Sequence, residues 1–317
     1  HDNKFLKRVL NQFSFAISCS LFSLFKVSNI DIIIATSPPL FAGIPGFFAS
    51  YFMRKPFILE IRDLMPEGAI QVGMMKNRGA IYFSKLLAQF LYKKSNHIIA
   101  LTDGIRESLI KLGIENKKID LITNGADTDF FKPGIESNFR SQFKLSNKFI
   151  VMYTGTFGHI HGFESIIASA KILNSKKYED IIFLLIGDGL KRKYLTNSIK
   201  KHKLKNIKII SPVSRKKMPQ TINAADVCLA TTHKSKIARG YIPSKMFEYM
   251  ACAKPIILGI DGEAERIIQK SNSGLCVGSE NPEGIVNAIL ELKENKGLRK
   301  KLANNARKTV EQQYSRD

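Results

Sequence analysis

The chain has 317 residues, 44% of them hydrophobic and 24% charged, so it can bury a substantial core, and its length favours two domains over one. Its formal net charge of +22 would suit nucleic acid, an anionic membrane surface or a phosphorylated substrate, but the lysines are spread along the chain without a compact arginine-rich block, which argues against nucleic acid. The sequence shows neither a signal peptide nor an apolar run of about 20 residues, and its four cysteines are dispersed, so it predicts a cytoplasmic protein with reduced thiols.

Short apolar strands alternate with amphipathic helical stretches along the chain. In chain order, the predicted strands are 31–35, 57–61, 97–101, 119–122, 149–153, 181–186, 207–210, 227–230 and 256–258. This alternation is typical of parallel sheets covered by helices on both faces, which bind ligands at the carboxyl ends of their strands. The sequence therefore predicts an α/β protein with two parallel sheets.

The segment between the fourth and fifth predicted strands carries turn residues and no strand pattern. We therefore expect a first domain over residues 1–134, a linker over 135–147 and a second domain over 148–317. Because ligands often bind where domains meet, the cleft between the two domains is the expected active site.

An apolar stretch of the first domain, residues 40–53, is short for a membrane span and is interrupted by Pro45. It predicts a helix packed within the protein, with lipid contact as the alternative. The positive charge of the chain keeps attraction to an anionic membrane surface as a separate expectation.

Arg62 and Asp63 directly follow the predicted strand 57–61, so they should project from the carboxyl end of the first sheet. There the carboxylate would orient a substrate hydroxyl and the guanidinium would offset phosphate charge. Alternatively, the pair fixes a loop by mutual hydrogen bonding. Glu67 is a further candidate on this side, or a helix-start residue that the helix dipole favours.

Two short polar segments of the first half predict structural roles. Thr102 is expected to cap a helix. In Asn124-Gly-Ala-Asp127, Gly125 is expected to adopt positive φ while Asn124 and Asp127 tie the turn by side-chain hydrogen bonds.

A glycine-containing loop, Tyr153-Thr-Gly-Thr-Phe-Gly158, follows the fifth strand and precedes a helix expected to begin near Gly162. Gly155 and Gly158 would let backbone amides approach a diphosphate closely, although they would equally serve strand-to-helix packing. His159 and His161 do not predict a metal site, because no third ligand stands at metal spacing.

The segment 239–255 carries the most specific pattern in the chain. Pro243 and Ser244 predict a helix start, so free backbone N–H groups and Lys245 would present positive charge to a phosphate. Glu248 lies three residues further along, on the same helix face, where its carboxylate would accept hydrogen bonds from paired sugar hydroxyls. The alternative is a capped surface helix with an ordinary Lys/Glu pair.

These segments, together with 60–67, 101–104 and 123–127, resemble in content and order the landmarks of retaining glycosyltransferases of family 4, in particular enzymes of bacterial surface polysaccharide synthesis such as O-antigen, capsule and colanic acid. The resemblance implies the GT-B fold, in which two Rossmann-like domains face a cleft. It also implies transfer of a hexosyl or N-acetylhexosaminyl group, with retention, from a nucleoside-diphosphate sugar, expected to be a UDP-sugar, to a polyprenyl-diphosphate-linked glycan. Such an enzyme needs no metal or other cofactor and works peripherally on the inner face of the cytoplasmic membrane.

The resemblance also assigns roles to residues. It implies that Glu248 binds the ribose and that a segment including Val213 lies against the base. The diphosphate would be held by a set of basic and loop residues: Gly155, Thr156, Gly158, Arg215, Arg239 and Lys245. Arg62 and Asp63 would face the acceptor, and with Glu248 they are the predicted catalytic residues. For Arg215 the alternative is an ordinary basic side chain on a solvent-exposed helix.

The chain departs from the family pattern at two places. The first of the two family glutamates is replaced by Gly240, and the family's basic pair near the phosphates is replaced by Thr156 and His161. Among Lys236, Arg239 and Lys245, we favour Lys245 as the substitute cation, because it lies inside the matched segment.

The first predicted strand follows a helix-like opening, so part of the first domain is expected to be missing, and so is the final helix that crosses back to it. The sequence given is therefore expected to be a fragment. Two other functions stay open at this point: a non-catalytic sugar-nucleotide-binding or scaffolding subunit, and a sugar-nucleotide epimerase.

Overall fold

A computed structural model describes residues 2–27, 29–71, 73, 75–235 and 238–316. The chain divides into two compact units, residues 1–123 and residues 124–317, which are described in turn. Within the described ranges, no helix combines the length and the hydropathy that crossing a membrane requires.

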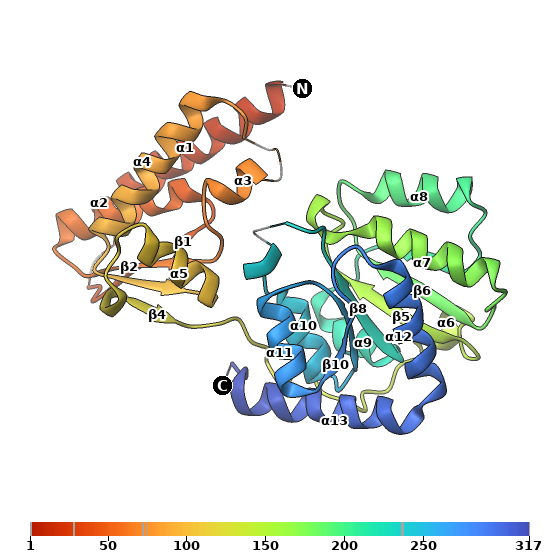
Figure 1. The fold of residues 1–317 in the computed structure, drawn as a ribbon. Coiled ribbons are helices and arrows are strands. Elements are labelled where there is room, and N and C mark those ends of the chain that lie inside the picture. The colour runs from red at the N-terminus through yellow and green to blue at the C-terminus, as the bar shows by residue number, and fades with distance from the viewer. Residues whose placement is uncertain (1, 28, 72, 74, 236–237, 317) are drawn as a thin grey trace. The chain divides into compact units, whose positions relative to one another are not determined.

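The first unit is built on a parallel sheet of four strands in the order β1–β2–β3–β4 (Figure 1). Its core lies between this sheet and the helices α4 and α5. The elements of the unit are α1 (Asp2–Lys26), β1 (Ile33–Ser37), η1 (Leu40–Ala42), α2 (Gly43–Met53), β2 (Phe57–Ile61), α3 (Glu67–Gln71), α4 (Arg78–Lys94), β3 (His97–Ala100), α5 (Asp103–Lys111), η2 (Asn116–Lys118) and β4 (Ile119–Leu121).

The second unit contains a six-stranded parallel sheet in the order β10–β9–β8–β5–β6–β7. Its elements are α6 (Phe139–Gln142), β5 (Phe149–Thr154), η3 (His159–His161), α7 (Phe163–Ser175), β6 (Ile181–Ile186), α8 (Arg192–Lys201), β7 (Ile207–Ile210), η4 (Arg215–Lys217), α9 (Met218–Asn223), β8 (Val227–Thr231), η5 (Ala238–Gly240), α10 (Ser244–Ala251), β9 (Ile256–Gly259), α11 (Glu263–Ser271), β10 (Gly274–Cys276), α12 (Pro282–Glu294) and α13 (Lys296–Gln313).

Helices cover both faces of the second sheet, as a parallel sheet requires (Figure 1). Along β5, Ile150 and Met152 join a cluster with α9, α10, α11 and α13. The alternate residues Val151 and Tyr153 join a cluster with α7 and α12 on the other face. The predicted pair of parallel α/β sheets is therefore confirmed.

Each of the nine predicted strands occurs within two residues of its expected bounds. The tenth strand, β10, was not predicted, because it has only three residues and begins with a glycine. Gly274 is needed there, since a Cβ would lie 2.1 Å from the carbonyl oxygen of Ile256 on the neighbouring strand.

The division between the units falls before Asn124, whereas the sequence places the connection at 135–147. The segment that follows Thr123 joins the second unit because its apolar side chains enter that core. Phe131, Phe139 and Leu145 are all buried in the cluster on the α10 face of the second sheet.

The expected helix in 40–53 forms, but it packs on one side only. α2 buries small residues, and at Gly46 a Cβ would lie 2.7 Å from the ring of Phe57. The aromatic side chains of Phe48, Tyr51 and Phe52 point to solvent from the same helix. The first unit therefore keeps an exposed aromatic surface.

Gly125 does not have the positive φ that we expected of it. Glycine is required instead because a Cβ would lie 2.2 Å from the carbonyl oxygen of Tyr314, which accepts a hydrogen bond from Ala126. The expected side-chain tie is present at Asp127, whose carboxylate accepts from the amide of Phe130.

Replacing Gly125 with alanine should lower the free energy of unfolding of the second unit by about 1–3 kcal/mol, because backbone atoms must shift to admit the methyl group. Chemical denaturation measures the change. The control is Gly297→Ala on α13, where the nearest atom is 3.4 Å from the added Cβ. That variant should gain about 0.4–1 kcal/mol. Equal stability of Gly125→Ala and the native chain would contradict the packing argument.

Candidate functional site

The order of strands in the second sheet points to one place for a ligand. β5 lies between β6 and β8, so the chain order reverses there. In open parallel sheets, ligands bind beyond the carboxyl ends of the strands at such a reversal. The loop after β5 and the segment after β8 are therefore the candidate site.

The first half of the loop after β5 is fixed by very close contacts with the loop after β6. The amide of Gly155 donates to Ile186, and the amide of Phe157 donates to the carbonyl of Asp188. A Cβ on Gly187 would lie 1.9 Å from the carbonyl oxygen of Gly155, and one on Gly189 would lie 2.7 Å from that of Phe157. Only glycine allows the two loops to approach in this way.

The second half of the loop is fixed to the segment after β8. Gly162, with φ of 54°, ends the loop, and a Cβ there would lie 2.9 Å from the backbone of Thr232. The hydroxyl of Thr231 donates to the carbonyl of His161 at 2.7 Å, and the amide of His233 donates to that of Ile160 at 2.9 Å. The loop is therefore held at both ends.

Two amides of this loop are left for a ligand. Within the part of the chain that the structure describes, the backbone amides of Thr156 and Gly158 donate to no protein group. Both residues retain solvent access. Free amides in a glycine-containing loop suit the oxygens of a phosphate.

The helix α10 brings Lys245 to this loop. One turn along the helix, the hydroxyl of Tyr249 accepts a hydrogen bond from the amide of Thr154 at 2.8 Å, which fixes α10 against the end of β5. Because residues four apart share a helix face, Lys245 then lies over the start of the loop. Its ammonium is 3.7 Å from the centre of the Tyr153 ring and 3.1 Å from where a Cβ of Gly155 would be.

The surroundings of Lys245 lower the pKa of its ammonium group. Burial of the ammonium group lowers the pKa of Lys245 to about 7, although the nearby charge of Glu248 acts to raise it. Burial, followed by the charges of Lys245 and His233, lowers the pKa of His161 to about 3. The imidazole of His161 is therefore neutral near neutral pH, and Lys245 is the adjustable cation of the loop.

Glu248 lies on the same helix under opposing influences. Burial raises the pKa of its carboxyl, while the charges of Arg215, Arg316 and Lys245 act to lower it. The guanidinium of Arg215 itself lies 5.7 Å from the ring centre of Phe130. The structure thus brings Glu248, Lys245, Arg215 and the glycine loop to one end of the second sheet.

Sequence reasoning missed Tyr249 and Arg316. Arg316 comes to the site because the chain beyond α13 pairs with the segment after the first unit, where the amide of Arg316 donates to Ala126. The ring of Tyr314 packs 4.7 Å from that of Phe247 on α10. Only a contact between distant segments reveals Arg316, whereas the spacing of Tyr249 from Lys245 on one helix was a usable signal.

The other residues of this unit that were predicted to bind the sugar donor make fewer side-chain contacts. Val213 follows β7 and packs partly buried against the core. Arg239 is exposed in η5, and its backbone packs against Gly262. Its guanidinium makes no hydrogen bond or ion pair with the residues that the structure describes. Gly240 is the last residue of η5, and Lys236 lies outside the described residues.

Arg62 and Asp63 stand where predicted, at the end of β2 in the first unit, and both are exposed. The amide of Arg62 donates to Ser37 at 2.8 Å. Surrounding protein raises the pKa of Asp63 although its side chain keeps solvent access, and the charge of Arg62 opposes the rise. These two described side chains form no hydrogen bond with each other, so the alternative of mutual loop fixation is not supported. Their catalytic role stays a prediction.

Two helix starts of the first unit and the expected lack of a metal site were also predicted. The hydroxyl of Thr102 caps α5 by accepting from the amide of Ile105, as expected, and Glu67 is the first residue of α3. No cluster of three or more metal-ligating side chains occurs within the part of the chain that the structure describes. That phosphate binding needs no metal stays a prediction.

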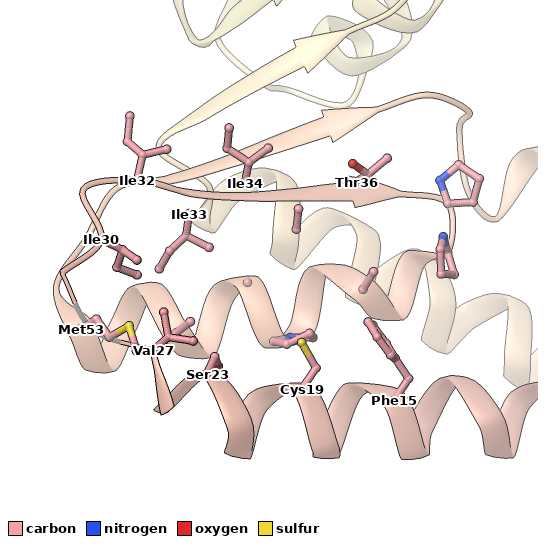
Figure 2. A pocket seen from close by; sticks show the side chains of 17 residues that line it. Phe15, Cys19, Ser23, Val27, Ile30, Ile32, Ile33, Ile34, Thr36 and Met53 are labelled. Atoms are coloured by element: carbon pink, nitrogen blue, oxygen red, sulfur yellow. The ribbon is translucent and has the colours of Figure 1, made fainter. Parts of the chain in front are cut away.

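A pocket of about 630 Å³ lies in the first unit between α1, β1 and α2 (Figure 2). Figure 2 shows Cys19 of α1 and Ile33 of β1 lining the space between strand and helices, while Ile34 and Thr36 point to the other side of the strand. Its lining is almost entirely aliphatic and aromatic, so it offers none of the charge that a phosphate needs. It suits a hydrocarbon.

Comparison with protein families matches both halves of the chain. Residues 134–309 match the family described as glycosyl transferases group 1, which is more than half of the chain. Residues 2–130 match the one described as glycosyltransferase family 4.

Among curated proteins, the chain is 22% identical over 312 residues to an uncharacterized glycosyltransferase of Methanocaldococcus jannaschii, covering 97% of this chain and 77% of the relative. It is 24% identical over 298 residues to a putative colanic acid biosynthesis glycosyl transferase, WcaI, of Escherichia coli, covering 90% and 72%.

Among solved structures, HepE of Anabaena in complex with UDP superposes with a TM-score of 0.77 at 19% identity, over 95% of this chain and 78% of that one. A glycosyltransferase of Rickettsia africae gives 0.73 at 19% identity, over 96% and 78%. These likenesses show the fold, and the predicted GT-B class is confirmed.

The lowered pKa of Lys245 can be measured directly. After reductive methylation with ¹³C, the resonance of Lys245 should titrate near pH 7, against about 10.4 for exposed lysines. Glu248→Gln should lower this midpoint further, because it removes the charge that favours the ammonium form. Lys245→Arg assigns the resonance, and exposed Lys270 on α11 is the internal control. A protein in which every lysine titrates above about pH 9 would contradict the described environment.

Proposed function

The chain belongs to the glycosyl transferases group 1 family, and we propose that it transfers a hexosyl or N-acetylhexosaminyl group, with retention, from a UDP-sugar to a polyprenyl-diphosphate-linked glycan in surface polysaccharide synthesis. The observation that carries the donor part is the position of Lys245, held over the glycine loop at the reversal of strand order in the second sheet. The family membership makes the chain a glycosyltransferase.

In this proposal the diphosphate of the donor lies on the loop after β5. The free amides of Thr156 and Gly158 and the ammonium of Lys245 bind its oxygens. Lys245 thereby supplies the charge that the family's basic pair supplies elsewhere, since His161 is neutral and Thr156 is uncharged. UDP is the proposed nucleotide because HepE, a structural neighbour, was solved with UDP.

The sugar is transferred when the bond from its anomeric carbon to the diphosphate breaks and the acceptor hydroxyl takes its place. Negative charge then grows on the departing diphosphate, so fixed amides and a cation beside it lower the barrier. Glu248 would accept hydrogen bonds from the ribose hydroxyls. Val213 would lie against the base, and Arg62 and Asp63 would face the acceptor.

A lipid-linked acceptor and a peripheral place on an anionic membrane are supported by the first unit. Large apolar side chains are exposed on its helices α1, α2 and α4: Phe15, Phe22, Tyr51, Phe52, Tyr82, Phe83 and Leu86 are examples. The exposed Lys85 lies among those of α4, and Arg54 ends α2. Apolar and basic side chains on the same helices suit an anionic lipid surface. The apolar pocket between α1, β1 and α2 would take a hydrocarbon chain.

Calorimetric titration in EDTA tests the donor site. UDP should bind in preference to ADP and GDP without added metal. Glu248→Gln should weaken UDP binding by roughly 10- to 100-fold, because it removes hydrogen bonds to a charged acceptor, with the melting temperature nearly unchanged. Lys245→Ala should act in the same direction.

Glu294→Gln, at the exposed end of α12, is the matched control for charge removal. Failure of the folded chain to bind any nucleotide would overturn the donor site, and a large fall in melting temperature for Glu248→Gln would assign that residue a structural role. UDP binding without sugar transfer would favour the alternative of a non-catalytic subunit.

Vesicle flotation tests the membrane face. The double variant Phe52→Asp/Phe83→Asp should weaken binding to phosphatidylglycerol vesicles by about tenfold or more, because each exposed phenylalanine contributes about 1.5–3 kcal/mol when buried. Leu190→Asp is the control, since Leu190 is more exposed than Phe52 and Phe83 but belongs to the second unit. Equal losses in both variants would rule out a localised membrane face.

A further inference from the structure

Glu164, in the first turn of α7, joins two basic side chains from different parts of the second unit. Its Oε1 accepts a hydrogen bond from the ammonium of Lys191 at 2.6 Å. Its Oε2 lies 3.1 Å from Nε2 of His233. This second oxygen is buried and accepts no well-directed hydrogen bond from the described residues, so its contact with His233 is an electrostatic one.

The same two basic residues also hold the glycine loop through their backbone. The amide of Lys191 donates to the carbonyl of Phe157, and the amide of His233 donates to the carbonyl of Ile160, each at 2.9 Å. Glu164 therefore ties together the two segments that grip the loop from either side. Through these segments, its carboxylate acts on the position of the loop amides without touching the ligand site itself.

The other ring nitrogen of His233 also meets a carboxylate, since Nδ1 lies 3.0 Å from Oε1 of Glu280. A neutral imidazole has one N–H and one lone pair, so it would turn its lone pair toward one of the two carboxylates. A doubly protonated ring would be attracted to both. The His233 ring thus links Glu164 of α7 to Glu280 before α12.

The surroundings keep Glu164 ionised as its partner requires. Burial acts to raise the pKa of Glu164, but the hydrogen bond from Lys191 and the charges of Lys191 and His233 outweigh burial and lower it. On the loop side, the positive charges of His233 and Lys245 both act on His161, which is neutral. The groups that face His233 are thus Glu164 of α7, Glu280 before α12 and His161 of η3.

We propose that Glu164, Lys191 and His233 form a positioning bracket, called here the Glu164 bracket, that fixes residues 155–162 in their phosphate-binding shape. For its ligand this proposal rests on the proposed function. The bracket makes donor affinity depend on residues that do not contact the donor. Loss of the Glu164 carboxylate loosens the loop and weakens binding.

Hydrogen exchange of the loop amides without nucleotide tests the bracket independently of the donor. Glu164→Gln and His233→Gln should raise exchange of the hydrogen-bonded amides that hold the loop, those of Phe157, Lys191 and His233, by roughly tenfold, a typical coupling between linked groups. Glu280→Gln, which removes an exposed carboxylate and spares the fold, should act in the same direction. His202→Gln, at the exposed end of α8, is the control and should change nothing. Unchanged exchange of these amides in Glu164→Gln, His233→Gln and Glu280→Gln would overturn the proposal.

UDP affinity tests the effect of the bracket on the donor. The native chain should bind UDP roughly tenfold more tightly than Glu164→Gln, because the loosened loop must be ordered when the donor binds. Equal affinity of the two proteins would overturn the effect of the bracket on binding. Absence of UDP binding by the native chain would instead defeat the proposed function, while the exchange experiment would still decide the bracket.

Discussion

The hydrogen bond from the amide of Thr154 to the hydroxyl of Tyr249 is the contact on which the candidate site depends. It joins the end of β5 to α10, the helix that follows β8 in the chain. It therefore fixes the position of α10 relative to the glycine loop. A slip of one residue along α10 would rotate Lys245 by about 100° away from Gly155. The position of Lys245 is thus set by a neutral hydrogen bond four residues away.

Much of the architecture follows from local pattern. The apolar runs gave the strands because parallel strands are buried on both faces, as β5 and β6 are along their whole length. The helix start at Thr102 follows from capping chemistry, and the start at Pro243 follows from the fixed φ of proline. β10 escaped prediction because its partners, and not its three residues, make it a strand. The unit boundary escaped prediction because burial of Phe131 and Phe139 is a tertiary property.

The candidate site was predictable in part for the same reason. Lys245, Glu248 and the glycine loop each sit within a short recognisable segment. The folded chain brings together Glu164, Lys191 and His233 because α7, the loop after β6 and the segment after β8 converge. No spacing in the sequence predicts this contact. Gly125 shows the limit in another way: its glycine is required by the carbonyl of Tyr314, far along the chain, and not by its own backbone angle.

The low proton affinity of Lys245 has a chemical consequence. Near neutral pH a share of the molecules carries a free amine there, because burial lowers the pKa of Lys245 to about 7, whereas ordinary lysines are almost wholly ammonium. A free amine is a nucleophile, and it stands beside amides that attract phosphate. An aldehyde that carries a phosphate group would be drawn to this lysine in preference to the many others of a strongly basic chain. The site thereby distinguishes one lysine chemically from all its neighbours.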